Sequence, residues 1–414
     1  MLAAPALAHG RAHHHHGFFG RGHSSRTLFA SPSGGSGTCT RQSPCSLADA
    51  VAAAGPHATV IATAGTYDGG VVVEEPITLV GRGAVIDASS SSNGNGIQIT
   101  GPGGSGSTVR GFKIENAEFE GILVGTSPVV TSSTSGQPAT GGAPVSDVRI
   151  LDNVVVNNDT GFGTTTGQCF STPNAPGDCG EAIHLVSVTD SLVAGNYVAD
   201  NAGGILLTDE FGPTDGNVIR GNQSIDNTKD CGITLGGHAM AVDPSTGKPT
   251  GAGGIFDNRM VDNIAIANGV KGQGAGILLG GGAPFAAVYD NLIRGNFTSG
   301  NGLAGITLHQ HFAGDLNGNV MVDNTLVSDN VDGDFDFAAA TAMPTTGIIV
   351  ASGLPPGVPA GAVPAPGPIT GTVIAHNRIL GDTTGIWTLG VDPATTTIAH
   401  NRFGAGVTTP VSTN

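Results

Sequence analysis

Residues 204–235 read GILLTDEFGPTDGNVIRGNQSIDNTKDCGITL, and they show the repeat from which the fold can be predicted. It begins and ends with the same short pattern, Gly-Ile-x-Leu. A second pattern lies between the two copies, in which an apolar residue is followed three positions later by asparagine, as Ile219 is by Asn222. Another asparagine, Asn227, follows five residues after the first. The stretch therefore holds one complete repeat and the beginning of the next.

The Gly-Ile-x-Leu pattern, or a close variant of it, occurs nine times, and the copies begin at Gly96, Gly121, Ala182, Gly204, Gly232, Gly276, Gly305, Gly347 and Gly385. Where no insertion intervenes, successive isoleucines are 22, 28 or 29 residues apart (183 to 205, 205 to 233, 277 to 306). Alternation within each short strand places Ile and Leu on one face. No unit buries that face alone, so the units must stack as a coil of parallel strands about 4.8 Å apart.

The asparagines and glycines of the repeat suit such a coil. Asparagine at the same turn of successive rungs can pass amide hydrogen bonds along the stack, and glycine beside it permits a left-handed backbone. The pattern resembles the right-handed parallel β-helix proteins of the pectate-lyase-like superfamily, with short repeats like those of NosD-like proteins. The resemblance covers about residues 60–405 and implies an all-β fold, a single right-handed parallel β-helix. It implies no one function, because this fold hosts lyases, hydrolases, epimerases, tailspikes and adhesins.

Four segments are expected along the chain. Residues 1–38 begin with MLAAPALA, which is typical of the end of a signal peptide, and continue as a disordered lead-in rich in histidine and glycine. Residues 39–58 form an N-terminal cap, in which Ser46 begins a short helix that plugs the first rung. Residues 59–405 form the β-helix, and residues 406–414 form a tail. The histidine run at 13–16 is interpreted as a solvated tract or a tag rather than a metal site.

The five cysteines point to an oxidising compartment. Cys39 and Cys45 bracket five residues, and Cys169 and Cys179 bracket nine in a loop rich in glycine and proline. Close pairs in loops suit local disulfides. Cys231 is left over and is expected to be reduced and buried. Together with the N-terminal pattern, this predicts a secreted, extracellular bacterial protein.

Composition and charge limit the partners. The 414 residues include 16 Lys and Arg against 32 Asp and Glu, a net charge of −16. This charge excludes a nucleic-acid footprint. It also disfavours a polyanionic substrate unless a metal compensates, while neutral glycans remain open. No stretch of 18 apolar residues occurs, so no transmembrane segment is expected. The expected partner is a polysaccharide or other glycan.

Polar residues gather where the predicted strands end. Three positions past the leucine of a strand stand Glu210, His238 and His311. In an in-register stack, Glu210 and His238 lie one rung apart, at about 5 Å, and His311 lies two rungs further on. A carboxylate beside imidazoles suits acid/base catalysis, so Glu210, His238 and the adjacent Asp209 are expected to be catalytic. A solvated polar edge without function is the alternative.

Metal binding and substrate contacts are expected near the same edge. His309 and His311 with Asp315 would suit a divalent metal, calcium or a transition metal, although the cofactor could equally be absent. His309 and His311 would otherwise contact substrate. His184 occupies the x position of its strand and is expected to face outward toward substrate. Arg220 and Lys229 are further candidates for substrate binding, with structural roles in turns as the alternative.

A second catalytic candidate precedes the strand at 232–235. Asp230 and Cys231 resemble the Asp-Asp-Cys strand start of polygalacturonase-type β-helix hydrolases. Only one of the two aspartates is present here, and neither Gly-His-Gly nor Arg-Ile-Lys occurs. The two carboxylates needed for glycoside hydrolysis are therefore not found together, and Asp230 is kept as an alternative catalytic residue.

These observations favour one function and leave two others open. Long segments at 125–144, 238–254 and 351–368 leave from the same edge of the coil and are expected to wall a groove. A secreted carbohydrate-active enzyme, a polysaccharide lyase, epimerase or hydrolase, is therefore favoured. The first alternative is a non-catalytic glycan-binding or adhesion protein, which is supported by apolar residues expected to face outward, namely Leu206, Leu278, Ile349 and Trp387. The second is a NosD-like metal-handling protein.

Overall fold

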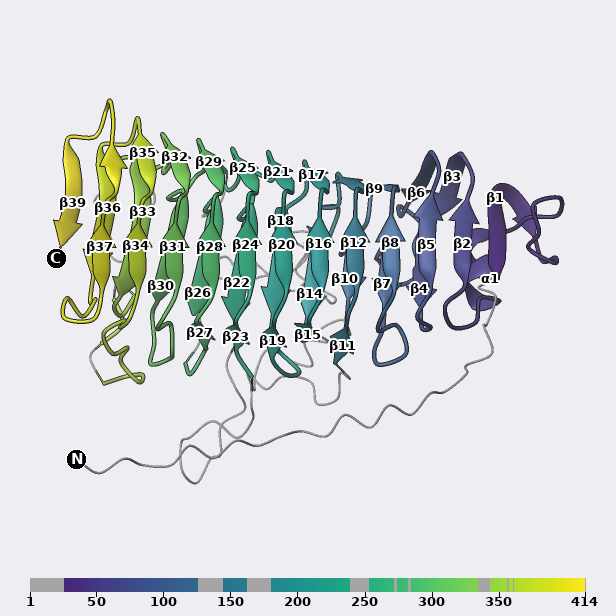
Figure 1. The fold of residues 1–414 in the computed structure, drawn as a ribbon, viewed down its shortest axis with the longest axis horizontal. Helices are drawn as coiled ribbons and strands as arrows, with labels where there is room; N and C mark the ends of the chain where they lie inside the picture. The colour runs from purple at the N-terminus through teal and green to yellow at the C-terminus, as the bar shows by residue number, and fades with distance from the viewer. Residues whose placement is uncertain are drawn as a thin grey trace, which may run out of the picture.

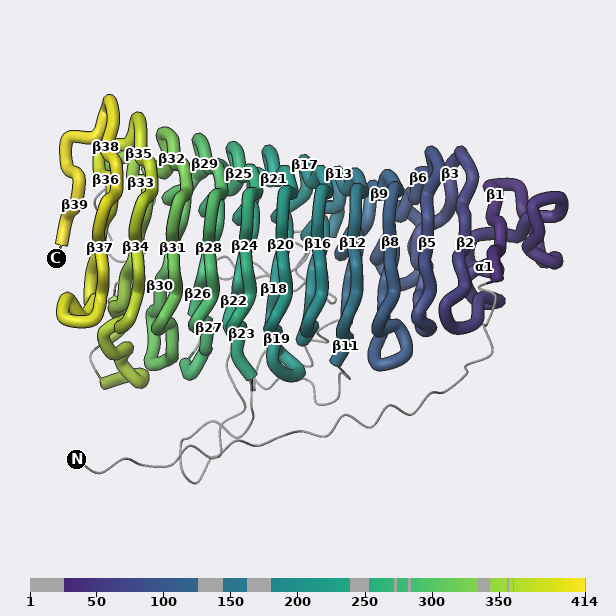
Figure 2. Tube along the Cα trace, viewed as in Figure 1, coloured from purple at the N-terminus to yellow at the C-terminus, as the bar shows by residue number. Residues whose placement is uncertain are grey.

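The structure, a computed structural model, describes residues 26–125, 144–161, 180–238, 253–271, 274–281, 284–333, 343–355, 357–359 and 361–413. In this part of the chain, short parallel strands wind into one long coil whose turns lie side by side along a single axis (Figure 1). A tube along the same path shows the turns following one another from the N-terminal to the C-terminal end (Figure 2). The predicted fold is confirmed: the protein is a right-handed parallel β-helix.

Four parallel sheets, here called A to D, form the walls of the coil. The twelve strands of sheet A are β1 (Thr27–Gly35), β2 (Thr59–Ala62), β5 (Thr78–Gly81), β8 (Thr108–Arg110), β12 (Arg149–Leu151), β16 (Leu192–Ala194), β20 (Val218–Arg220), β24 (Arg259–Val261), β28 (Leu292–Arg294), β31 (Val320–Val322), β34 (Val373–Ala375) and β37 (Thr397–Ala399). The eleven strands of sheet B are β3 (Gly65–Asp68), β6 (Ala84–Asp87), β9 (Lys113–Glu115), β13 (Val154–Val156), β17 (Tyr197–Ala199), β21 (Gln223–Ile225), β25 (Ile264–Ile266), β29 (Phe297–Ser299), β32 (Thr325–Val327), β35 (Arg378–Leu380) and β38 (Arg402–Phe403).

Sheets C and D complete each turn. The eleven strands of sheet C are β4 (Val71–Val73), β7 (Ile97–Ile99), β10 (Ile122–Val124), β14 (Glu181–Val186), β18 (Gly203–Thr208), β22 (Ile233–Gly237), β26 (Ile277–Gly281), β30 (Ile306–Gln310), β33 (Thr346–Ser352), β36 (Thr384–Leu389) and β39 (Thr409–Thr413). The five strands of sheet D are β11 (Val145–Ser146), β15 (Val188–Thr189), β19 (Thr214–Asp215), β23 (Ile255–Phe256) and β27 (Val288–Tyr289). In each turn the chain passes from sheet C to sheet A and then to sheet B. In the middle rungs it also passes through sheet D between sheets C and A.

The Gly-Ile-x-Leu copies form sheet C, and their isoleucines stack inside the coil. The row Ile183, Ile205, Ile233, Ile277 and Ile306 is in register from strand to strand, and each of these residues is at most 1% exposed. The predicted interior row is therefore confirmed. The hydrophobic effect along this row holds each rung to its neighbours.

Asparagine ladders run along three inner corners of the coil. In each step, the Oδ1 atom of one asparagine accepts hydrogen bonds from the backbone N–H and from Nδ2 of the asparagine one turn earlier, as Asn222 does from Asn196. The ladders comprise Asn153, Asn196, Asn222, Asn263, Asn296, Asn324, Asn377 and Asn401; Asn158, Asn201, Asn227, Asn268 and Asn301; and Asn217, Asn258, Asn291 and Asn319. These bonds satisfy buried polar groups at the turns, as the repeat predicted.

The first glycine of the pattern is required by a close approach between rungs. A Cβ atom on Gly276 would lie 2.6 Å from the carbonyl oxygen of Gly305 and 2.8 Å from Nδ2 of Asn301. On Gly204, it would lie 2.1 Å from the carbonyl oxygen of Gly232. All three distances are below van der Waals contact, so glycine at these two positions lets successive turns come this close.

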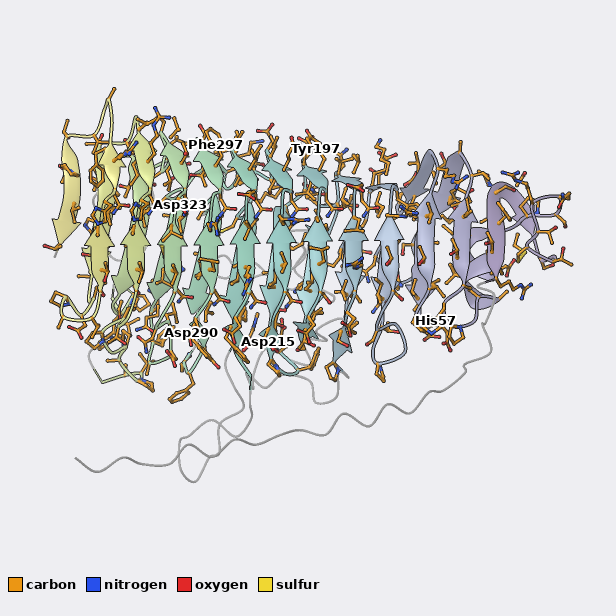
Figure 3. The ribbon with its side chains drawn as sticks, viewed as in Figure 1. His57, Tyr197, Asp215, Asp290, Phe297 and Asp323 are labelled. Carbon is orange, nitrogen blue, oxygen red and sulfur yellow. A yellow bond between two sulfur atoms is a disulfide. The ribbon has the colours of Figure 1, made fainter. Side chains whose placement is uncertain are left out.

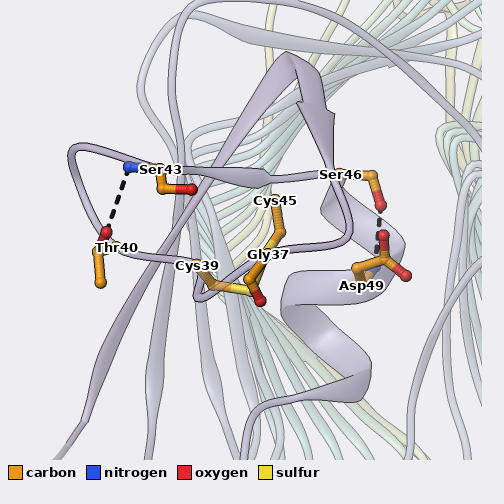
Figure 4. The surroundings of a disulfide bond; sticks show 7 residues. All are labelled: Gly37, Cys39, Thr40, Ser43, Cys45, Ser46 and Asp49. Carbon is orange, nitrogen blue, oxygen red and sulfur yellow. Dashed lines mark hydrogen bonds between the residues drawn. A yellow bond between two sulfur atoms is a disulfide. The ribbon is translucent and has the colours of Figure 1, made fainter.

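A short helix and a disulfide close the N-terminal end. Helix α1 (Leu47–Ala52) follows Ser46, whose side chain accepts a 3.1 Å hydrogen bond from the backbone N–H of Asp49. Cys39 and Cys45 form a disulfide beside it (Figure 4). The predicted cap, its first residue and this disulfide are confirmed. Cys169 and Cys179 lie outside the described residues, so their pairing stays a prediction.

The expected boundaries at both ends of the coil are wrong. Residues 27–35, expected in a disordered lead-in, form β1, which pairs in parallel with β2. Residues 409–413, expected in a tail, form β39, which pairs with β36. Both segments lack the Gly-Ile-x-Leu pattern, but backbone hydrogen bonding to the neighbouring rung requires no particular side chain.

Candidate functional site

The candidate site lies on the outer face of sheet C, near the ends of its central strands. Along one outward-facing row, Thr208 of β18 pairs with Gly236 of β22, Gly236 with Gly280 of β26, and Gly280 with His309 of β30. We call these four residues the glycine floor. The two glycines leave this row without a side chain on two successive rungs. A Cβ atom on Gly280 would lie 3.4 Å from Nε2 of His309, so the imidazole borders this bare stretch.

A carboxylate and an imidazole meet beside the floor. Glu210 follows Thr208 by two residues and His238 follows β22 directly, so both face outward on adjacent rungs. Nε2 of His238 lies 3.5 Å from Oε1 of Glu210. The predicted juxtaposition of these two residues is confirmed, and the register persists although two glycines precede His238.

The carboxylate of Glu210 is buried without a hydrogen bond. Its side chain is 8% exposed, and neither oxygen has a hydrogen-bond partner within the part of the chain that the structure describes. Burying a polar group unpaired costs free energy, and a charged one costs more. Such a group is uncommon in native structures, where strain, a catalytic role or a bound water or ion accounts for it. As far as the described residues go, only the imidazole of His238 approaches this carboxylate as a charged partner, and such a carboxylate can bind a ligand or accept a proton.

Asp209 has a different role from the one expected. Its side chain is fully buried, and it accepts hydrogen bonds from the backbone N–H groups of His238 at 2.8 Å and Gly254 at 2.7 Å. Nδ1 of His238 lies 3.7 Å from Oδ1 of Asp209. Both carboxylate oxygens are thus engaged. Asp209 holds the two ends of the 238–254 segment and orients His238, rather than contacting substrate as a catalytic residue.

His309 and His311 lie together, but the expected metal set does not form. Their ring centroids are 5.0 Å apart, and both side chains are partly exposed. Asp315 is exposed and its Oδ1 atom accepts a hydrogen bond from the backbone N–H of Asn317. Among the described residues, no three His, Cys, Asp or Glu side chains are grouped so as to hold a metal ion.

His184 lies on the expected face but is inaccessible. It is 0% exposed, and its Nδ1 atom lies 3.1 Å from Oε1 of Glu120 while Nε2 lies 2.9 Å from Oγ1 of Thr208. The expectation of substrate contact by His184 is wrong. Alternation indicates the face of a strand and not what covers it. The resulting acid–imidazole–hydroxyl chain spans three consecutive rungs. Long insertions separate Glu120 from His184 in the sequence, so no sequence signal joins these two residues.

Three other candidate residues lie away from the floor. Arg220 ends β20 and is exposed on sheet A. Lys229 and Asp230 precede β22, whereas His238 follows it, so they lie at the opposite end of that strand. Lys229 forms an ion pair with Asp159, and Oδ1 of Asp230 accepts a hydrogen bond from the backbone N–H of Cys231. The structure does not bring these residues to the Glu210 site.

The four apolar residues that were expected to face outward from sheet C are buried or partly buried. Leu206 is 3%, Ile349 2% and Trp387 7% exposed, and Leu278 is partly buried. Ile349 and Trp387 belong to a second hydrophobic cluster outside the coil, which also contains Cys231. Cys231 is reduced and buried as predicted, and burial together with the neighbouring Asp230 raises its pKa well above the usual value. The expected exposed apolar stripe, and with it the support for a binding protein, is absent from the described residues.

The insertions near the site are only partly described. Most of 125–144 and 238–254 lies outside the described residues. The segment at 351–368 returns to the site: the carbonyl oxygen of Gly367 accepts a hydrogen bond from Nε2 of Gln310, and that of Pro364 accepts one from the backbone N–H of Ala313. This segment therefore borders the strand end that carries His309 and His311.

Comparisons with known proteins support the architecture. No protein family matches the sequence, and no curated protein is similar to it in sequence. The structure is similar to the A-module of the Azotobacter vinelandii mannuronan C-5 epimerase AlgE4, with a TM-score of 0.53 and 16% identity, over 86% of this chain and 89% of that one. It is also similar to the A-module of the epimerase AlgE6, with a TM-score of 0.50 and 13% identity, over 88% of this chain and 89% of that one. At such identities the likeness establishes the class of fold, the parallel β-helix. No helix among the described residues has the length and apolar character to cross a membrane.

Proposed function

We propose that the protein is a secreted polysaccharide-active enzyme, a lyase or epimerase of uronate residues, with Glu210 and His238 as its acid/base pair. One observation carries the proposal: Glu210 is buried, lacks a hydrogen bond among the described residues and lies 3.5 Å from an imidazole nitrogen. A carboxylate held in this way is suited to accept a proton from carbon. The Cys39–Cys45 disulfide supports secretion.

In the proposed lyase reaction, Glu210 removes the C5 proton of a uronate residue. The electron pair of the broken C–H bond forms a C4–C5 double bond while the C4–O4 bond breaks. His238 donates a proton to the leaving O4 atom, so that one chain ends in an unsaturated uronate and the other in a hydroxyl. In the epimerase variant, the C4–O4 bond stays intact and a proton returns to C5 from the opposite face.

Substrate contacts come from the residues around the glycine floor. The bare backbone at Gly236 and Gly280 leaves space against the sheet for a sugar residue. His309 and His311 stand at one end of this stretch, where an imidazolium would neutralise the carboxylate of a uronate. A protonated imidazole there would offset part of the −16 net charge, which otherwise disfavours an anionic chain.

Hydrolysis is a weaker proposal because it needs a second available carboxylate. Glycosidases place two carboxyl groups roughly 5–9 Å apart. Asp209 adjoins Glu210, but both of its oxygens accept hydrogen bonds from the backbone. Among the described residues at this position, only Glu210 has carboxylate oxygens without a hydrogen bond.

The proposal is tested by incubating the purified protein with alginate, polygalacturonate, glucuronan and neutral polysaccharides. We expect ultraviolet absorbance of unsaturated uronate for a lyase, or deuterium incorporation at C5 in heavy water for an epimerase. Glu210→Gln and His238→Ala should each lower turnover about 10²-fold or more with little change in Tm. The matched control is Asp68→Asn, an exposed aspartate on sheet B. New reducing ends without unsaturated products would indicate hydrolysis, and full activity of Glu210→Gln would refute the assigned site.

A further inference from the structure

The arginines missing from the Glu210 site gather on another face of the coil. Five arginines lie on the outer face of sheet A, all of them exposed: Arg110, Arg149, Arg220, Arg259 and Arg294. They are five of only 16 cationic side chains in the protein. Between them, the same face carries partly buried apolar residues: Leu151, Leu192, Ala194, Val218, Val261 and Leu292. We call this surface the arginine strip.

The arginines alternate between two rows that run along the coil axis. Arg149 and Arg259 begin their strands, and the register places them in one row, three rungs apart. Arg110, Arg220 and Arg294 end their strands and lie in the other row. With about 4.8 Å per rung, the arginines of the second row recur at roughly 14 Å and 10 Å. The spacing of rungs is close to the length of one sugar residue in an extended chain.

Four of the five guanidinium groups are not paired with a carboxylate. Arg294 lies 3.8 Å from Asp323, a contact between side chains that are 60% and 57% exposed. Within the described ranges, no carboxylate lies within 4.0 Å of the other four arginines. These four exposed arginines therefore have no carboxylate partner among the described residues, in a protein that has twice as many acidic as basic residues.

Aspartates border the strip on both sides. They occupy the turns that lead into and out of sheet A, and all are exposed: Asp147, Asp190, Asp257 and Asp290 on one side, and Asp152, Asp262 and Asp323 on the other. Asp323 lies where the strands of sheet A end, whereas Asp290 and Asp215 lie near their beginning (Figure 3). At the latter border, the rings of Phe256 and Tyr289 stack with centroids 5.0 Å apart. Cationic donors thus run along the middle of the strip, and anionic acceptors run along its borders.

Two hollows on this face combine these groups. One, of about 360 Å³, is lined by Arg149 and Arg220, by Asp147 and Asp190, and by the apolar Leu192 and Val218. The other, of about 330 Å³, is lined by Arg82, Arg110 and Asp152 together with Val80. Each hollow offers donors, acceptors and an apolar floor in one place.

From this arrangement we infer that the arginine strip binds a neutral polysaccharide chain that lies along the coil axis. Sugar hydroxyls both donate and accept hydrogen bonds, so they match arginine donors beside aspartate acceptors. The C–H faces of the rings match the Leu and Val floor. Seven bordering aspartates against five arginines give the strip no net positive charge, which disfavours an anionic chain. The strip is on a different sheet from Glu210, so this binding is independent of the proposed reaction.

The test uses the whole chain carrying Glu210→Gln, so that turnover does not remove the ligand. Affinity electrophoresis and titration calorimetry would be run with soluble β-glucan, xylan, mannan and galactan as neutral probes, and with alginate and polygalacturonate as anionic ones. We expect at least one neutral probe to bind, with little dependence on salt, and Arg149→Ala/Arg220→Ala to weaken it tenfold or more.

The matched control is Arg378→Ala/Arg402→Ala, which removes two exposed arginines from sheet B and should leave binding unchanged. Arg149→Lys/Arg220→Lys keeps the charge but removes the planar fork of donors, so it should also weaken binding while preserving the fold. Binding of anionic probes alone, no binding of any neutral probe, or unchanged binding in both strip variants would overturn the inference. Failure of the lyase or epimerase assay with the native enzyme would leave these measurements unaffected.

Discussion

Replacing Asp329 by asparagine should stabilise the protein above neutral pH, because the substitution removes a buried charge. Asp329 occupies the next step of the asparagine ladder after Asn301. Its Oδ1 atom accepts hydrogen bonds from the backbone N–H of Asn301 at 3.1 Å and from Nδ2 of that residue at 2.8 Å. Its own backbone N–H donates to Oδ1 of Asp382 at 2.8 Å. Two buried carboxylates therefore follow one another where the ladder would otherwise continue with amides.

Burial raises the pKa of both carboxyl groups to about 7, and the charge of Asp329 adds to the shift at Asp382. Hydrogen bonds from Thr298 and Asn301 oppose the shift at Asp329. In the unfolded chain, aspartate has a pKa near 3.9. The folded state therefore keeps protons that the unfolded chain has lost, and its stability falls as pH rises from about 4 to about 7. For a single group, a pKa raised from about 3.9 to about 7 lowers the free energy of unfolding by about 4 kcal/mol once the pH is above 7. The two coupled carboxyl groups together should lower it by several kcal/mol.

Asparagine at position 329 would supply the missing Nδ2 donor to Asp382 and remove one of the two like charges. We expect Asp329→Asn to raise the free energy of unfolding by about 1–3 kcal/mol at pH 8 and to change it little at pH 5. Urea unfolding followed by circular dichroism at several pH values measures both, with Asp68→Asn as the exposed control. A variant that is less stable at pH 8, or that keeps the native pH dependence between pH 4 and 8, would refute this reasoning.

Three further changes have defined outcomes. Gly276→Ala should lower the free energy of unfolding by about 2–4 kcal/mol, because the new Cβ atom would lie 2.6 Å from a carbonyl oxygen. Gly55 has open space around it, so the control Gly55→Ala should change this free energy little. Equal Tm values of the two variants would contradict this reasoning. His184→Ala leaves a buried carboxylate and a buried hydroxyl without their imidazole partner. Thermal unfolding should show a free energy of unfolding lower by about 3–5 kcal/mol. A decrease below about 1 kcal/mol would show that the hydrogen bonds from Glu120 through His184 to Thr208 are not needed for stability. Thiol titration of the unreduced, folded protein should find no reactive thiol, because Cys231 is buried. After denaturation it should find one free thiol. Three free thiols after denaturation would disprove a bond between Cys169 and Cys179.

The coil could be predicted from sequence because its repeat is local. The pattern at Gly204 and Gly232 fixes both the strand period and the distance between rungs. Counting from the strand leucine also brought Glu210 beside His238, because parallel pairing kept that register across the two rungs. Proximity could therefore be predicted for residues that occupy the same position of adjacent rungs, as Glu210 and His238 do.

The remaining features depend on interactions that the repeat does not encode. His184 was placed on the correct face, yet its burial depends on what covers that face. Arg220 belongs to the apolar-x-x-Asn unit that recurs along the chain, and only the three-dimensional structure shows that it lies on sheet A, away from the Glu210 site. Asp209 is adjacent to Glu210 and chemically similar, but two backbone donors engage its oxygens. Sequence indicates residue type and row, whereas hydrogen-bond partners determine which carboxylate remains reactive.

The asparagine ladders give the coil an electrical direction. Along Asn196, Asn222 and Asn263, the Nδ2 atom of each amide donates to the Oδ1 atom of the next rung toward the C-terminus and also to a backbone carbonyl of the rung before, whereas each Oδ1 atom accepts from the rung before. The amide dipoles of the three ladders therefore point the same way and add along the axis, with the positive end toward the C-terminus. Strand dipoles run across that axis and contribute little to it. A β-helix with such ladders acquires an axial dipole of the kind familiar from α-helices, and Asp329 accepts the last donors of one column, as an acidic side chain does at a helix N-terminus.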